Sequence, residues 1–339
     1  MPGLIEGTGL VAVVLLVAAL ASGVVERAPL SFPMIFLGIG FLLGEGGLAV
    51  LEIDLQSPIL IAVATISLAL VLFLDAVNLN LEEIRSDWYV PFMTMIPGPL
   101  LIIGGIALVA YTLLGLDFTQ SLLLGAILAS TDAVVLRDVV RDERIPRSIR
   151  RALSVEAGMN DIVTLPIVLI LIAVANAQLD GWQDWVSFIG RILVLSPLVG
   201  IIIGGVGARL MQAADNRLKI QLEYQALYGI GLVLAAFFAG TMVNGDGFLA
   251  AFFAGLGVTL FNSTLCDCFL DYGEVTSEML MMLAFIFFGA VLSTMITTVD
   301  LVSVTILALI GLIIVRPIAL RIVLVGAKMS PTARLFIGW

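Results

Sequence analysis

The chain has 339 residues, of which 61% are hydrophobic and 12% are charged, and its formal net charge is −10. Soluble domains carry about a quarter charged residues, and a soluble fold of this size cannot hide so much apolar surface from water. The composition therefore excludes a soluble globular protein and indicates a membrane protein.

Apolar segments long enough to cross a bilayer recur along the whole chain. A helix of roughly 20 apolar residues spans the ~30 Å hydrocarbon core. The segments are continuously apolar and do not alternate with a period of two, so they are predicted to be helices and not barrel strands. The first resembles the apolar core of a signal peptide but follows Glu6 rather than a basic leader, so we expect a retained helix. In chain order the eleven predicted spans are 8–25, 30–51, 57–79, 90–114, 119–137, 149–175, 186–211, 224–243, 246–262, 279–297 and 300–325.

Lysine and arginine positions predict the orientation. The connection between the fifth and sixth spans reads RDVVRDERIPRSIRR, and the connection after the seventh contains Arg209, Arg217 and Lys219. The alternate connections carry no lysine or arginine. This asymmetry places the basic connections in the cytoplasm and the N-terminus outside the cell membrane. An acidic connection near Asp267 and Asp271, cytoplasmic by parity, does not fit the pattern.

The sequence lacks several features on which other kinds of chemistry depend. The chain has no histidine, so proton chemistry near neutral pH must use carboxylates. Its two cysteines, Cys266 and Cys268, are too close for an ordinary disulfide and do not show metal-ligand spacing. No phosphate-binding glycine loop is present, which argues against an ATP-driven pump. We expect no cofactor other than the transported ions.

Ionisable residues inside predicted spans are costly and are therefore candidates for function. The candidates, with two polar neighbours, are Asp75 in the third span, Thr131 and Asp132 in the fifth, Glu156, Asn160 and Asp161 in the sixth, and Arg316 in the eleventh.

Asp161 lies near the middle of the sixth span, with apolar residues on both sides. A lone carboxylate there favours its protonated form, and an arriving cation reverses that preference. Hard cations prefer oxygen ligands, which Asp132, Thr131 and Asn160 could add. A group that holds either H⁺ or a cation is the minimum chemistry of an exchanger, so Asp161 and Asp132 are the predicted ligands of a monovalent cation.

Other interpretations remain open for the remaining residues. Glu156 and Arg316 could neutralise each other as a structural ion pair. Asp132 could face the cytoplasm at a helix end, and Asp75 could be solvated at an interface. A pair formed by Asp132 and Asp161 could also serve an intramembrane aspartyl protease. The Gly-x-Gly-Asp type of sequence expected for such an enzyme is absent, and we expect no enzyme.

The pairing of Thr131-Asp132 with Glu156 and Asn160-Asp161 resembles the prokaryotic sodium/proton antiporters of the NhaP type. These are relatives of the animal sodium/hydrogen exchangers within the monovalent cation:proton antiporter superfamily. Further markers that fit the pattern are Asp75 in LFLDAVNLNLEEIR, Arg316 before Pro317, and the closing ARLFIGW. The resemblance covers essentially the whole chain.

The resemblance implies an all-α polytopic membrane protein with the inverted-repeat antiporter fold, in which about 11 of an expected 13 transmembrane helices are present. It implies scaffold and dimerisation helices 1–3 at residues 1–85 and core helices 4–6 with the ion site at 86–176. It further implies linker helix 7 at 177–218 and scaffold helices 8–10 at 219–298. Residues 299–339 would begin the second core repeat, with helix 11 and the start of helix 12. Because helix 12 would only be starting at Trp339, we expect the native chain to continue.

The resemblance also implies alternating-access exchange of a monovalent cation, Na⁺ first, for H⁺ in a homodimer that serves pH homeostasis. Asp161, Asp132, Thr131, Asn160 and Asp75 would bind ion and proton, and the Asn160-Asp161 pair implies electroneutral exchange. A K⁺/H⁺ exchanger, a gated K⁺ efflux system of related fold and a non-transporting scaffold subunit are the alternatives. Two residues depart from the family pattern: Ala133 replaces a frequent proline, and Ala157 replaces a frequent serine.

Overall fold

A computed structural model of the chain describes residues 31–79, 89–131, 142, 144–176, 181–261, 263–327 and 329–338, together with Gly9 and Leu16, and omits the side chains of 147, 148, 151, 263–271 and 298. The predicted first span, 8–25, therefore lies outside the described ranges. Over these ranges the regular structure is helical, apart from one isolated bridge between Gly44 and Leu51.

Seven helical segments in the described ranges are long and apolar enough to cross a membrane, and three shorter apolar helices accompany them. This confirms the predicted all-α polytopic membrane fold. The helices are α2 (Phe32–Leu43), α3 (Pro58–Val77), α5 (Tyr89–Met95), α6 (Pro97–Leu113), α7 (Phe118–Ala129), α9 (Arg147–Ala175), α10 (Trp182–Gly190), α11 (Ser196–Leu218), α12 (Leu222–Met242), α13 (Gly247–Phe261), α14 (Ser263–Met295), α15 (Leu301–Ile310), α16 (Arg316–Val323) and α17 (Pro331–Ile337).

In two places a pair of helices is joined by a π-helical turn, which is wider than an α-helical turn. Arg191–Leu195 joins α10 to α11, and Gly311–Val315 joins α15 to α16. In both cases one residue separates the end of the turn from a proline, Pro197 or Pro317. Proline has no N–H to donate to the preceding turn, which favours an irregular hydrogen-bond pattern there.

The acidic connection expected around residues 263–278 is wrong, because this stretch is helical. Helix α14 begins at Ser263 and runs for 33 residues, about 50 Å at 1.5 Å per residue. That length exceeds the hydrocarbon core. The helix can therefore continue beyond the bilayer into water. Acidic residues on that part of the helix are solvated there, as they would be in a loop.

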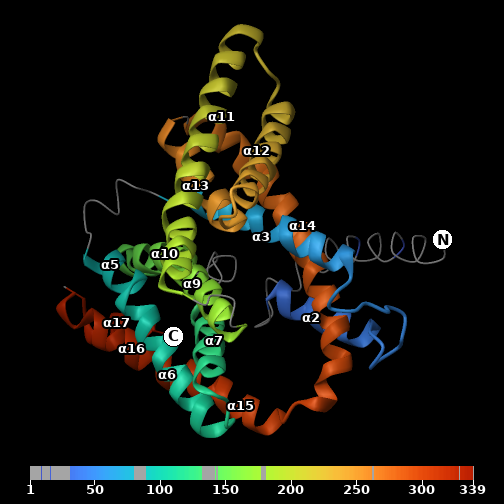
Figure 1. The fold of residues 1–339 in the computed structure, drawn as a ribbon. Helices are drawn as coiled ribbons and strands as arrows, with labels where there is room; N and C mark the ends of the chain where they lie inside the picture. The colour runs from blue at the N-terminus through green and yellow to red at the C-terminus, as the bar shows by residue number, and fades with distance from the viewer. Residues whose placement is uncertain are drawn as a thin grey trace.

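The helices form two groups (Figure 1). In the first, α3, α11, α12 and α13 share a core that includes Leu70, Phe73, Val233 and Ala254. Helices α2 and α14 extend this group through a second cluster around Phe36 and Ile286. The second group packs α5, α6, α7, α9, α15, α16 and α17 around a separate core.

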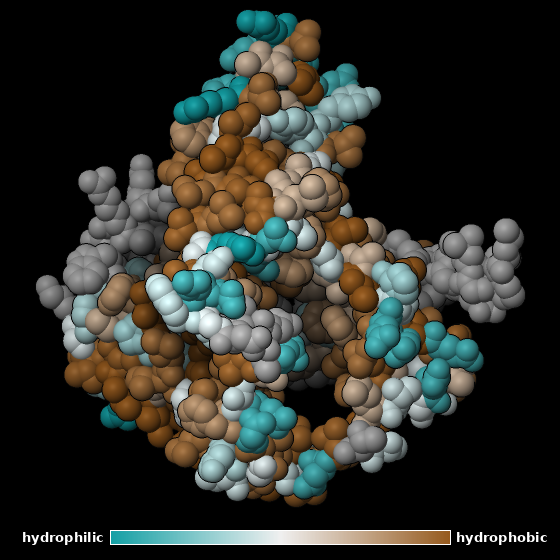
Figure 2. Space-filling model, viewed as in Figure 1, coloured by the Kyte–Doolittle hydropathy of each residue, from teal (hydrophilic) through white to brown (hydrophobic). Residues whose placement is uncertain are grey.

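The two groups meet where α9 crosses α3 and α13. Met159, Ile162 and Leu165 of α9 pack against a small buried cluster that includes Leu72 and Phe252. Figure 2 shows that the surface is hollowed between the group containing α7 and α9 and helices α2 and α14. The site helix α9 thus lies along the boundary of the two groups.

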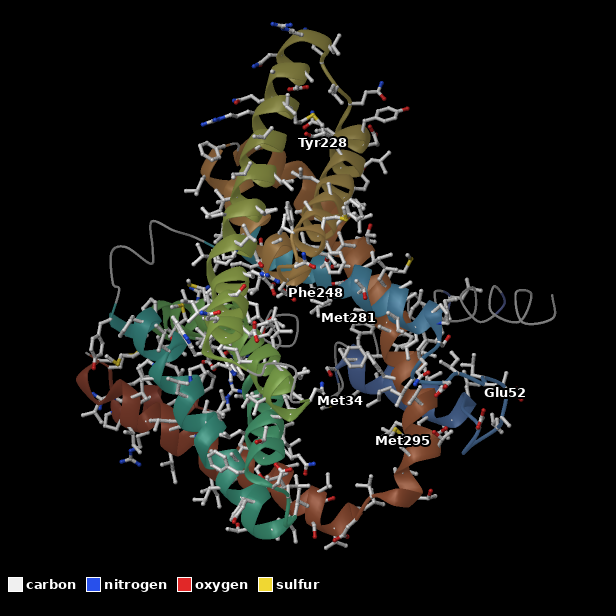
Figure 3. The ribbon with its side chains drawn as sticks, in the orientation of Figure 1. Met34, Glu52, Tyr228, Phe248, Met281 and Met295 are labelled. Carbon is white, nitrogen blue, oxygen red and sulfur yellow. The ribbon has the colours of Figure 1, made fainter. Side chains whose placement is uncertain are left out.

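Polar contacts also join elements within the first group. Tyr228 of α12 points toward α11 (Figure 3) and donates its hydroxyl hydrogen bond to the carbonyl of Gly207 at 2.9 Å. The outer face of α11 carries exposed Leu198, Ile202, Val206 and Leu210, spaced by four residues. An apolar stripe of this kind is suited to contact with lipid.

Candidate ion-binding site

The site is built around a helix that stops inside the predicted fifth span. Helix α7 ends at Ala129, rather than near 137, and Ser130 is extended, with φ −67° and ψ 142°. The last carbonyls of a helix lack intrahelical partners. The Asn160 side chain supplies one, because its Nδ2 donates to the Ala129 carbonyl at 3.2 Å. Helix α9 therefore stabilises the end of α7 through Asn160. The sequence has Ala133 at the nearby position where the family pattern frequently has proline, a residue that would favour a break.

Residues 132–141 lie outside the described residues, and with them the predicted ligand Asp132. The described part of the site is formed by α7, α9 and α16 and by the facing end of α3.

Asp161 of α9 is partly buried and faces the break in α7. Its Oδ1 accepts a hydrogen bond from the Ser130 hydroxyl at 2.6 Å and another from the Thr164 hydroxyl at 3.4 Å. Hydroxyl donors favour the ionised carboxylate, which would otherwise be costly within a membrane. Asp161 thus lies beside non-helical backbone with hydroxyl oxygens within reach.

Asn160 is almost fully buried, with 1% of its surface exposed. Its side-chain nitrogen donates to the end of α7. Its backbone carbonyl accepts from the Thr164 hydroxyl at 3.1 Å and shares that one hydrogen with Asp161 Oδ1. Its side-chain oxygen is buried and has no hydrogen-bond partner among the described residues. A buried amide oxygen of this kind can still accept from water or contact a cation.

Glu156 and Arg316 form an ion pair between α9 and α16. Arg316 Nη2 lies 2.6 Å from Glu156 Oε1 and donates to the Thr131 hydroxyl at 2.6 Å. Thr131 in turn donates to Glu156 Oε1 at 3.3 Å. The Glu156 and Arg316 side chains are 3% and 16% exposed. Helices α9 and α16 and the non-helical segment after α7 are therefore linked by one closed polar triangle.

Arg316 is positioned by the irregular turn that precedes it. The π-helical turn Gly311–Val315 ends directly before Arg316, and Pro317 follows. Gly338, just after α17, packs so closely on Pro317 that an added Cβ would lie 2.7 Å from its Cα. The C-terminal helix α17 thus supports the segment that holds the arginine.

Asp75 lies two residues before the last residue of α3, Val77. Its backbone carbonyl faces Gly158 of α9, 3.8 Å from the position of an added Cβ. The structure thus brings Thr131, Asn160, Asp161 and the ion pair together at the end of α7, and it places Asp75 on the facing helix. In the described part of the chain, no three His, Cys, Asp or Glu residues converge into a metal-binding group.

A family model described as "Sodium/hydrogen exchanger, transmembrane" matches residues 12–339 of this chain. The chain belongs to the sodium/hydrogen exchanger family. This confirms the family indicated by the Asn160-Asp161 pair and its companion residues.

Two curated relatives show what this exchanger-family chain is similar to. It is 25% identical to "K(+)/H(+) antiporter NhaP" of Alkalimonas amylolytica, over 97% of this chain and 57% of that protein. It is 31% identical over 209 residues to "Na(+)/H(+) antiporter 2" of Zygosaccharomyces rouxii, 58% of this chain and 25% of that protein. The exchanger-family chain thus spans only part of the length of these relatives. Both are named as transporters and not as enzymes.

Among solved structures, the exchanger-family chain matches the sodium proton antiporter MjNhaP1 from Methanocaldococcus jannaschii. The TM-score is 0.83 at 18% identity, over 100% of this chain and 82% of that one. This likeness establishes the antiporter fold for the chain.

Ser130 is a site residue that the sequence did not single out. It stands directly before Thr131-Asp132, in a run that reads as part of an apolar helix. A hydroxyl in a helix usually bonds back to its own turn, so serine in a helical segment carries little signal. Only the break after Ala129 turns this hydroxyl toward Asp161.

Proposed function

We propose that the protein containing this chain is a monovalent cation/proton antiporter in which Asp161 holds H⁺ and the cation in turn. The observation that carries the proposal is the position of Asp161, partly buried in a membrane helix and 2.6 Å from a hydroxyl at the break in α7. A carboxylate in a membrane helix can hold either a proton or a cation, and each of them offsets its negative charge.

The exchange is electroneutral if Asp161 crosses the membrane with one positive charge in either direction. Protonated Asp161 and cation-bound Asp161 carry the same charge. Asn160 beside it is an amide and adds no titratable charge. Asn160, Asp132 and Asp75 assist by supplying side-chain oxygens near the carboxylate, and Thr131 by its backbone carbonyl. Glu156 with Arg316 holds the helices in place.

Alternating access would move one helix group past the other. The moving core would comprise residues 86–176 and 299–339, the scaffold 1–85 and 219–298, and the linker helix 177–218. Two observations support this division: the helix groups have separate cores, and they meet at the small cluster around Phe252. Transporters with inverted repeats generally place the substrate at such a boundary, next to broken helices.

The first cation candidate is Na⁺, and K⁺ is the second. The relative from Alkalimonas amylolytica, named for K⁺/H⁺ exchange, aligns over 97% of this chain, whereas the relative from Zygosaccharomyces rouxii is named for Na⁺/H⁺ exchange. Initial exchange rates at graded Na⁺, Li⁺ and K⁺ concentrations would rank the apparent affinities. A lower half-saturation concentration for K⁺ than for Na⁺ would favour the second candidate.

We place the protein in the cell membrane as a homodimer with its N-terminus outside. The basic connection that contains Arg144 and Arg150 supports this orientation, because lysine and arginine concentrate in cytoplasmic connections.

The proposal is tested in everted membrane vesicles that contain the full-length protein. Adding Na⁺ or K⁺ to vesicles acidified by respiration should release the quenching of a pH-sensitive dye. Asp161→Asn keeps the size of the side chain and removes its titration, so the release should be lost. Cation-driven release of the same size in the Asp161→Asn variant would rule out the assignment of Asp161.

A further inference from the structure

Ser130 differs from most hydroxyl residues in the described helices. Thr112, Thr241 and Thr259, for example, donate to carbonyls one turn earlier in their own helices. Ser130 lies just beyond the end of α7, and its hydroxyl donates to Asp161 on another helix. Its orientation is therefore set by the carboxylate.

The neighbouring hydroxyl of Thr131 already accepts one hydrogen bond and donates another. It accepts from Arg316 at 2.6 Å and donates to Glu156 at 3.3 Å. A hydroxyl has one hydrogen and two lone pairs. The positive guanidinium directed at the Thr131 oxygen makes it a poor ligand for a second cation.

The Ser130 hydroxyl oxygen, unlike that of Thr131, can accept a further contact from a cation. Its hydrogen is used by Asp161, and both lone pairs of its oxygen have no hydrogen-bond donor among the described residues. The residue is also exposed, whereas Asn160 and Glu156 are buried. A cation that approaches the Asp161 carboxylate therefore meets the Ser130 oxygen beside it.

We propose that the Ser130 hydroxyl is an oxygen ligand of the transported cation, next to Asp161. The inference rests on the proposed antiport function and adds a residue to its binding site. Because the hydroxyl is neutral, it contributes to cation affinity and to discrimination between cations. The charge carried per transport cycle does not depend on it.

The test compares variants of the full-length protein in proteoliposomes at one fixed pH, with Na⁺, Li⁺ and K⁺ as substrates. Ser130→Ala should raise the apparent KM for the preferred cation about tenfold, as expected for losing one hydroxyl contact to a charge. The maximal rate should stay within about twofold, and the ranking of the three cations should change. Ser130→Thr retains a hydroxyl and should restore the apparent KM.

Ser121→Ala is the matched control. Ser121 lies on α7, the helix that ends just before Ser130. It is 1% exposed, and its hydroxyl has no partner in the described part of the chain. This variant should have the parental apparent KM, and the melting temperature of each variant checks that it is folded.

The outcomes test the role of Ser130 separately from the proposed antiport function. An unchanged apparent KM in Ser130→Ala, or a loss of rate that Ser130→Thr does not rescue, would overturn the role of Ser130 alone. A parent protein that exchanges none of the three cations would overturn the antiport proposal, and the ligand role of Ser130 with it.

Discussion

Glu156 and Asp161 lie five residues apart on α9, yet they have different partners. Glu156 is paired with Arg316 and Thr131, and its surroundings contain a fixed positive charge. Asp161 receives hydroxyl hydrogen bonds from Ser130 and Thr164. A fixed cation beside Glu156 leaves little reason for a mobile cation to bind there. The hydroxyl of Ser130, beside Asp161, is a neutral oxygen that a cation can contact.

Breaking the Glu156–Arg316 pair from one side should destabilise the fold. Glu156→Gln leaves the buried guanidinium without its counter-charge, and Arg316→Gln does the same to the carboxylate. Removing one partner of a buried pair typically costs about 3–5 kcal/mol. We expect a large fall in melting temperature for each single variant.

The double variant Glu156→Gln with Arg316→Gln should lose clearly less stability than the sum of the single losses, because no charge remains unpaired. Additive losses in thermal unfolding of the detergent-solubilised protein would show that the pair is not coupled.

The sequence identified the acidic residues of α9 because they interrupt an apolar run. It could not identify Ser130, because a serine beside an apolar helix breaks no pattern. Its role depends on where α7 ends, and Asn160 of another helix donates a hydrogen bond to that end. Tertiary contacts therefore set the part of the site that residue types did not indicate.

At the scale of elements, α7 and α6 pack with their backbones in close contact. A Cβ at Gly125 would lie 2.5 Å from the Ile103 carbonyl oxygen, whereas a Cβ at Gly104 would meet no atom within 4 Å. Gly125→Ala should therefore destabilise the protein by ~1–3 kcal/mol, the usual cost of overpacking. Gly104→Ala is the matched control and should be neutral or slightly stabilising. Equal effects of the two variants on the melting temperature would contradict this packing.

The turn between α12 and α13 depends on Asp246 as a cap. Asp246 Oδ1 accepts from the Leu249 N–H at 2.7 Å, and its own N–H donates to the Ser196 hydroxyl at 2.7 Å. Burial raises the pKa of Asp246 above its ordinary value of 3.8, against the opposing effect of the backbone N–H donors. The folded protein therefore binds this proton more tightly than the unfolded chain does.

The raised pKa of Asp246 predicts the direction in which stability changes with pH. The stabilising contribution of the proton is complete below pH 3.8 and is lost as pH rises through the folded-state pKa of Asp246. Asp246→Asn retains an oxygen for Leu249 and should remove that part of the pH dependence. Asp246→Ala loses the cap and should cost about 1 kcal/mol across the range. Melting temperatures measured against pH for both variants would show this, and a parental slope in Asp246→Asn would contradict it.

Helix boundaries show where sequence patterns stop being informative. Apolar length predicted the spans that became α3, α9 and α12 to within a few residues. It overextended α7 past Ala129, and it placed a connection where α14 is helical. Both errors have one cause: an apolar run measures how much chain lipid can surround, whereas hydrogen bonding decides where a helix begins and ends.

Across the whole molecule, alternating access requires the two helix groups to move relative to each other. Gly158 of α9 and Leu79, just beyond α3, face each other across the boundary, and an added Cβ at Gly158 would lie 3.1 Å from Leu79 Cδ2. In a background with Cys266 and Cys268 replaced, cysteines at 79 and 158 joined by a short thiol cross-linker should stop exchange. Reduction of a cleavable linker should restore it.

A cross-link inside one group is the control for this experiment. Gly98 and Leu320 have matching geometry, 3.0 Å by the same measure, but both belong to the group that contains α6 and α16. Cysteines at 98 and 320 should leave exchange intact when they are joined. Full exchange with residues 79 and 158 joined would contradict the movement of one group past the other.

The most direct test of the central claim is proton release on cation binding by the purified full-length protein. If Asp161 holds H⁺ and the cation in turn, adding Na⁺ or K⁺ to the protonated protein in weakly buffered detergent solution should release a proton for each cation bound. Asp161→Asn should release none. Cation binding without proton release in the parent, or undiminished release in Asp161→Asn, would contradict the account.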